Sequence, residues 1–147
     1  MPAGGEPLGF VYFVGVKYAG YTAYCAWVIQ RAVRKVAVPG ATPVAPWLAG
    51  GARTLIGVVV GAAVSLGYWA IPFFSTHDGW MTWLFFGLLI PVRVGEWWLL
   101  LRWIYGGFSL QDSTRWKLIA GGIGTSFGLD GLGIVAAFVL PGGLWVC

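Results

Sequence analysis

The sequence predicts an all-α integral membrane protein: a bundle of four transmembrane helices that forms a single transmembrane domain over residues 1–147. Three observations lead to this prediction. Of the 147 residues, 59% are hydrophobic and 10% are charged, whereas soluble proteins carry roughly 25% charged residues. Four stretches stay mainly apolar over the about 20 residues that a helix needs to cross a bilayer. Most positive charges stand at the ends of these stretches, where topology signals occur.

The four predicted spans cover about residues 8–30, 54–74, 80–103 and 118–140. A basic run, Arg31, Arg34 and Lys35, follows the first span. The next segment, VPGATPVAPWLAGG, contains three prolines, so we expect a linker without regular helix. The turn STHDG joins the second and third spans, and the polar segment GGFSLQDSTRWK joins the third and fourth.

The positive charges also predict the orientation. Seven of the nine Lys and Arg residues flank the two longer loops: Arg31, Arg34, Lys35, Arg53, Arg102, Arg115 and Lys117. Basic loops remain on the cytoplasmic side, so we expect both termini on the non-cytoplasmic side, in a bacterial cytoplasmic membrane. The first residues, MPAGGEP, lack a positive n-region, and we expect no cleaved signal peptide.

Four charged residues fall near the middle of predicted spans: Lys17, Arg93, Glu96 and Asp130. A charge in hydrocarbon costs at least about 2.5 kcal/mol, so such residues are rare, usually paired, and mark functional or assembly sites. Two positive and two negative charges at similar depth predict one internally neutralised cluster, used for binding or for assembly.

Several pairings are open within this cluster. Arg93 and Glu96 lie three residues apart and can pair on one helical face, yet one carboxylate satisfies only part of a guanidinium. The remaining donors must find Asp130, backbone carbonyls, water or an anionic ligand. Asp130 either pairs with Lys17 or Arg93, which suits a static bundle, or takes up a proton, which suits proton transfer.

Lys17 shares its helical face with Tyr21 and Tyr24, which follow it by four and seven residues. This row of one ammonium and two phenols is a possible lining of a polar groove. The Lys17 side chain reaches only about one helical turn toward the interface. Its expected partner is therefore a carboxylate inside the bundle, that of Asp130 or Glu96.

Two rows of small residues at four-residue spacing are candidates for helix packing. They are Gly57, Gly61 and Ser65 in the second span, and Ala120, Gly124 and Gly128 in the fourth. Small residues let helices approach closely in lipid, where no hydrophobic force drives them together. Each row either packs inside the bundle or forms a docking face for another chain.

The sequence argues against several classes of protein. The net charge of +4 leaves no basic stripe for a nucleic acid once the span ends are assigned. One histidine and two distant cysteines, Cys25 and Cys147, predict no metal site and no disulfide. The sequence contains no nucleotide-binding or hydrolase motif. It identifies no cofactor, and we expect contacts with membrane lipids.

We therefore predict a small, non-enzymatic accessory or structural subunit of a larger membrane complex, in contact with other membrane protein chains. Short loops and the small-residue rows favour this class. One alternative is a homo-oligomeric transporter or channel that uses the charged cluster. A second alternative is a membrane enzyme acting on a lipid or quinone, with Arg93 holding an anion and Glu96 or Asp130 acting as acid or base.

Overall fold

The computed structural model describes residues 7–36, 44–70, 80–105 and 110–137, and these ranges are helical almost throughout and contain no strand. The prediction of an all-α bundle is confirmed. The elements are α1 (Pro7–Tyr24), a π-helical turn η1 (Cys25–Ile29), α2 (Gln30–Val36), α3 (Pro46–Ala70), α4 (Trp80–Ile104) and α5 (Asp112–Ala137). Because α1, η1 and α2 are continuous, the described chain forms four helical rods.

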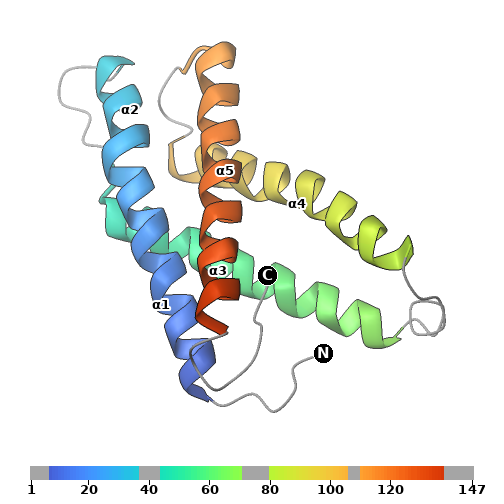
Figure 1. Ribbon diagram of the computed structural model, residues 1–147. Helices are drawn as coiled ribbons and strands as arrows, with labels where there is room; N and C mark the ends of the chain where they lie inside the picture. The colour runs from blue at the N-terminus through green and yellow to red at the C-terminus, as the bar shows by residue number, and fades with distance from the viewer. Residues whose placement is uncertain (1–6, 37–43, 71–79, 106–109, 138–147) are drawn as a thin grey trace.

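The four rods form two pairs (Figure 1). The α1–α2 rod and α5 lie side by side and run in opposite directions, and α3 and α4 form a hairpin that crosses them. α1 packs against α3 and α5, and α4 packs against α5 and α3. The far end of the hairpin extends away from the other two rods (Figure 1). The core therefore lies where the two pairs cross.

The π-helical turn keeps one face of the first rod buried. The buried residues of this rod recur at every fourth position: Phe13, Lys17, Tyr21, Cys25, Ile29 and Val33. An α-helix has about 3.6 residues per turn, so a four-residue repeat advances by about 40° each time and would wind away from the core. The wider turn η1 takes up one extra residue, which rotates the following residues back by roughly 100°. Ile29 and Val33 thereby stay on the inner face.

Two helices begin earlier than predicted. α3 starts at Pro46, about two turns before the predicted span, because proline fits the first turn of a helix, where its missing N–H has no partner to lose. The Ala45 carbonyl accepts hydrogen bonds from the backbone N–H groups of Leu48 (3.0 Å) and Ala49 (3.2 Å). α5 starts at Asp112, inside the predicted polar connection, and its carboxylate stands at the positive end of the helix dipole.

The evidence for membrane spans is weaker than the evidence for the bundle. Among the described helices, one stretch, Pro46–Ala63 in α3, is long and apolar enough to cross a membrane. One such helix supports a membrane location only weakly, and the four-span topology stays a prediction. The STHDG turn, both termini, and the ends of the predicted spans 54–74 and 118–140 beyond residues 70 and 137 lie outside the described residues.

Trp97 of α4 occupies the centre of the core and is completely buried. The rings of Tyr21 and Tyr24 on α1 meet its indole edge-on, with centroid separations of 5.8 and 5.2 Å. The indole N–H donates to Ser126 Oγ on α5 at 3.1 Å. A Cβ at Gly122 would lie 2.5 Å from the Trp97 ring, so this large side chain fits against α5 only because residue 122 is glycine.

Close helix contacts occur at glycines outside the two predicted rows. A Cβ at Gly50 of α3 would lie 2.8 Å from the Thr22 backbone, which makes Gly50 the crossing point of α1 and α3. In the first predicted row, Gly57 lies against its own neighbour Arg53, 3.3 Å from a built Cβ to Nη1; Gly61 is partly exposed, and the Ser65 side chain lies outside the described part of the structure.

The second predicted row, Ala120, Gly124 and Gly128, is exposed on the outside of α5. Among the described residues, nothing lies within 4 Å of a Cβ built at Gly124 or Gly128. No helix of the described ranges packs against this row, so its interpretation as a docking face for another chain stays a prediction. Within the described part of the chain it is an uncovered face of α5.

Candidate functional site

The structure brings the four charged residues of the predicted cluster, Lys17, Arg93, Glu96 and Asp130, together in one buried network. Lys17 Nζ of α1 lies 2.7 Å from Asp130 Oδ1 of α5. Asp130 Oδ2 accepts a hydrogen bond from Arg93 Nη2 of α4 at 3.0 Å. Arg93 Nη1 lies 3.4 Å from Glu96 Oε2, one turn along the same helix. The predicted pairs Lys17–Asp130, Arg93–Asp130 and Arg93–Glu96 thus exist simultaneously.

A fifth charge, Arg53 of α3, completes the network. Its Nη2 donates to Glu96 Oε2 at 2.6 Å, the shortest ion pair among the described residues. All five side chains belong to residues that are at most 5% exposed. The network therefore runs Lys17–Asp130–Arg93–Glu96–Arg53 and connects all four rods; we call it the charge network.

The sequence predicts that Arg53 flanks a loop, and this prediction is wrong. Because α3 begins at Pro46, Arg53 lies about two turns inside the helix and is fully buried. Proline at a helix start and the small residues Gly50, Gly51 and Ala52 were the signals that a helix begins before residue 54. Six of the nine basic residues, instead of seven, then remain beside the two loops.

Including Arg53 changes the charge balance of the site. Three cations face two carboxylates, so the network carries a formal excess of one positive charge and is not neutral as predicted. Two aromatic rings compensate in part: the Arg53 guanidinium carbon lies 4.8 Å from the Tyr21 ring centroid and 5.1 Å from that of Trp97. Contact with aromatic faces stabilises a desolvated guanidinium by about 2 kcal/mol or more.

The arginines still have unused donors. Arg53 Nε and Nη1 and Arg93 Nε are buried and make no hydrogen bond to the described residues. Each carboxylate, in contrast, is shared by two cations from different helices. Loss of either carboxylate would therefore remove an ion-pair partner from two cations at once, although Arg93 would keep the other carboxylate, and this makes Glu96 and Asp130 the most sensitive members of the network.

Tyr21 and Tyr24 line the core and not a groove. Tyr21 is 1% exposed and packs between Trp97 and the Arg53 guanidinium. The Tyr24 hydroxyl donates to the Leu118 carbonyl of α5 at 2.7 Å. Both phenols thus pack the first rod against α4 and α5, whereas the Lys17 ammonium lies 4.2 Å from the Phe13 ring centroid, one turn before it.

The two hydroxyls near Asp130 do not bind its carboxylate. Ser126 Oγ accepts from the Trp97 indole and donates to the Gly122 carbonyl at 3.0 Å. Thr125 Oγ1 donates to the Gly121 carbonyl at 3.0 Å. The local partner considered for Asp130 is therefore absent among the described residues, and its carboxylate is held by Lys17 and Arg93 alone.

Within the described ranges, no three His, Cys, Asp or Glu side chains are grouped so that they could hold a metal ion. No protein-family model, curated protein or solved structure matches this chain. The site must therefore be interpreted from its own geometry, which is a linear row of alternating charges at the crossing point of two helix pairs.

Proposed function

We propose that this protein is an integral membrane subunit without catalytic activity of its own, which docks onto another membrane protein chain through the outer face of α5. The membrane is a bacterial cytoplasmic membrane, with the six remaining loop-flanking basic residues on the cytoplasmic side. Neither nucleic acid nor a metal takes part. The charge network holds the four rods in one arrangement, and the exposed row on α5 receives the partner helix.

The observation that carries this proposal is the open face of α5. Ala120, Gly124 and Gly128 form an exposed small-residue row, no described residue lies within 4 Å of a Cβ built at Gly124 or Gly128, and Phe127 and Leu132 beside the row are exposed. In lipid, small residues at this spacing let two helix backbones approach and gain van der Waals contacts. A row that no helix of the described chain covers is suited to a helix from a second chain.

The exposed apolar surface supports a membrane environment. Large apolar side chains are exposed on every rod, including Val11, Trp27, Leu55, Leu66, Trp103 and Leu132. A soluble monomer rarely exposes continuous apolar patches of this kind. Lipid and a partner chain together would cover them.

The charge network supports a structural role for the buried charges. Three ion pairs between rods and one within α4 hold the carboxylates of Glu96 and Asp130, and a buried ion pair is best known for fixing one arrangement of helices. Under this proposal the charges of α4 are covered by the chain itself, and the partner is needed only for the apolar face of α5.

The first test is the mass of the protein extracted from its own membrane in mild detergent and measured by native mass spectrometry. A discrete complex with other chains is the expected result. A monomer, or an oligomer of this chain alone, would contradict the proposal.

The second test addresses the face itself through Gly124→Leu and Gly128→Leu. Both variants fill the row with bulk in open space, so we expect the complex to dissociate while the isolated chain stays folded. Gly15→Leu is the matched control, because Gly15 on α1 is equally exposed and has nothing within 4 Å of a built Cβ. Equal loss of the complex in all three variants would remove α5 as the docking face.

A second candidate is a homo-oligomeric transporter or channel, favoured by the alternating row of five charges across the bundle. Such rows are found in proton and ion pathways through membranes. In proteoliposomes, Asp130→Asn would abolish an ion or proton flux if this candidate holds. Wild-type proteoliposomes that pass neither protons nor small ions above the rate of empty vesicles would eliminate it.

A further inference from the structure

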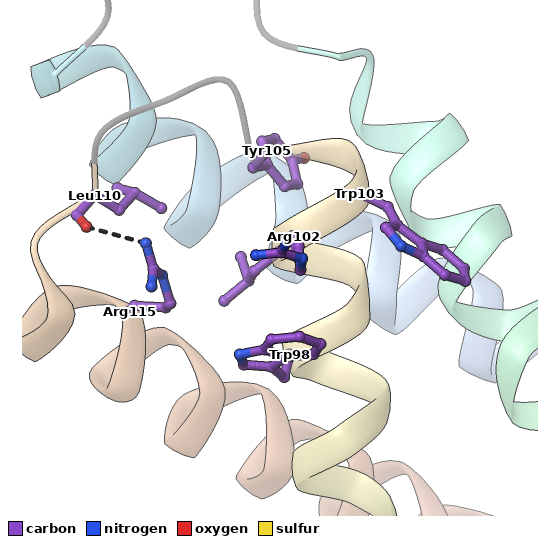
Figure 2. A pocket seen from close by; sticks show the side chains of 7 residues that line it. Trp98, Arg102, Trp103, Tyr105, Leu110 and Arg115 are labelled. Carbon is purple, nitrogen blue, oxygen red and sulfur yellow. Dashed lines mark hydrogen bonds between the residues drawn. The ribbon is translucent and has the colours of Figure 1, made fainter.

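A second cluster of cationic and aromatic side chains lies outside the charge network, where α4 ends and α5 begins. It lines a hollow of about 360 Å³. Its polar and aromatic lining comes mainly from Trp98, Arg102, Trp103, Tyr105 and Arg115. In Figure 2, Arg102 lies on α4 between Trp98 and Tyr105, which directly follows the end of α4, and Arg115 stands opposite on α5. Two guanidinium groups from facing helices thus share one hollow.

Arg102 is available for a ligand. Its guanidinium carbon lies 5.5 Å from the Trp98 ring centroid, which holds the planar group against an aromatic face. Among the described residues, Arg102 forms no ion pair with a carboxylate. Tyr105, which is 1% exposed and belongs to the core, forms the wall of the hollow nearest the core.

Arg115 is only partly engaged. Its Nη1 donates to Asp112 Oδ1 at 3.1 Å, and its Nη2 donates to the Leu110 carbonyl at 3.4 Å (Figure 2). The Asp112 side chain is 87% exposed, so water and salt weaken this pair. Two guanidinium groups and one exposed carboxylate give the hollow a formal charge of +1, which matches the single negative charge of a phosphodiester.

We propose that this hollow binds a phosphate group, as the phosphodiester of an anionic phospholipid headgroup or as free phosphate. Arginine offers a fork of donors that matches two phosphate oxygens at once. The volume is within the roughly 300–1,000 Å³ of small-ligand sites. The lipid source rests on the membrane location proposed above: basic pockets between helices at the cytoplasmic surface bind anionic headgroups, and tryptophans concentrate at that depth.

The test uses delipidated protein in mild detergent and native mass spectrometry with three probes: phosphatidylglycerol, phosphatidylcholine and inorganic phosphate. We expect Arg102→Gln and Arg115→Gln each to weaken phosphatidylglycerol binding about tenfold, since one charge-assisted hydrogen bond contributes about 1.5 kcal/mol. Lys117→Gln is the matched control, because it removes one charge at the same end of α5 from a residue that does not line the hollow.

Asp112→Asn tests the same site in the opposite direction. It removes the carboxylate that competes for Arg115, so we expect phosphatidylglycerol to bind several-fold more tightly. A gain in affinity cannot result from a variant that fails to fold, which keeps the proposal testable even if an arginine variant is unstable.

The probes separate the two sources. Binding of phosphatidylglycerol that exceeds that of phosphatidylcholine and depends on Arg102 identifies a lipid headgroup. Binding of inorganic phosphate with the same dependence, and no preference for phosphatidylglycerol, supports the phosphate site but contradicts a lipid headgroup as its ligand. The proposed site would be wrong if Lys117→Gln lost as much phosphatidylglycerol affinity as the arginine variants. It would also be wrong if every variant bound all three probes equally well. None of these results depends on whether α5 docks a partner, because each is measured on the isolated chain.

Discussion

Helix α5 carries two rows of residues at four-residue spacing, and they have opposite surroundings. The inner row, Gly122, Ser126 and Asp130, faces the core: it receives the Trp97 ring, accepts its indole N–H and engages two cations. The outer row begins two residues earlier, at Ala120, and no residue in the described part of the chain lies within 4 Å of a Cβ built at Gly124 or Gly128. Glycine spacing alone does not tell them apart; the difference lies in the side chain that stands opposite.

This comparison indicates what small residues contribute in such a helix. In the inner row, the missing side chain of Gly122 makes room for a bulky partner from the same chain. In the outer row the same absence leaves a shallow track that another helix can occupy. The two rows should therefore respond to substitution with opposite signs.

The largest expected effect is that of Asp130→Asn, which breaks the charged end of the inner row. Lys17 would lose the carboxylate that lies 2.7 Å from its Nζ, and Arg93 would keep only its longer contact with Glu96 at 3.4 Å. Removal of one partner from a buried pair costs about 3–5 kcal/mol. Asp112→Asn on the same helix is the control, since its exposed pair with Arg115 contributes about 0–1 kcal/mol. Unfolding of detergent-solubilised protein by SDS titration gives both free energies. Equal losses would mean that the network does not stabilise the fold.

The next largest effect is expected from substitution of Gly122 in the inner row. Gly122→Ala places a methyl group 2.5 Å from the Trp97 ring, so we expect a loss of about 1–3 kcal/mol in the free energy of unfolding. Gly122→Ser should not rescue it, because any Cβ meets the same ring. A neutral result for both substitutions, from the same SDS titration, would contradict the inner packing described here.

A smaller effect is expected from Ser126→Ala. The Trp97 indole N–H would lose its acceptor, and one such hydrogen bond contributes about 1 kcal/mol. Thr125→Ala is the neighbouring control, since the Thr125 hydroxyl bonds only to the Gly121 carbonyl of its own helix. Tryptophan fluorescence of the Ser126 variant should also change, as the indole environment is altered. Equal changes in the free energy of unfolding of both variants would mean that the Trp97–Ser126 hydrogen bond does not stabilise the fold.

The smallest effect has the opposite sign. Gly124→Ala should stabilise the isolated chain by up to about 1 kcal/mol, because alanine favours a helix more than glycine and its methyl group meets nothing. The same substitution should weaken association with a partner, which sedimentation of the complex would detect. A loss of stability in the isolated chain would show that this face is covered from within.

The sequence was sufficient to predict the helical bundle and the convergence of four of the five network charges. Charged residues in the middle of a long apolar stretch are usually paired when they are buried. The pairing of Lys17 with Asp130 can therefore be predicted from their positions in the sequence. The place of Arg53 in the network was not predicted, because the segment before it contains three prolines and was interpreted as a linker. The helix α3 in fact starts at the last of these prolines, Pro46. The four-residue repeat from Phe13 to Val33 was present in the sequence, and it was the available signal for the π-helical turn.

Which glycines make contact could not be predicted from spacing. Gly50 and Gly122 are close-contact positions because Thr22 and Trp97 happen to stand opposite, and this depends on how the two helix pairs cross. The crossing in turn depends on side chains far apart in the chain, such as Arg53 and Glu96, which are 43 residues apart. Local patterns identified the small faces, but only the tertiary arrangement assigns each face to the core or to the surface.

The distribution of charges over the rods has a consequence for biosynthesis. The first two rods bring only cations to the charge network, Lys17 and Arg53, whereas both carboxylates arrive later, on α4 and α5. During synthesis these two cations therefore precede Glu96 and Asp130, the carboxylates that they contact in the folded chain. A charged residue near the centre of a helix disfavours insertion of that helix into a membrane. We expect ribosome-bound chains that end before α4 to stay crosslinkable to that machinery, and full-length chains to be released from it.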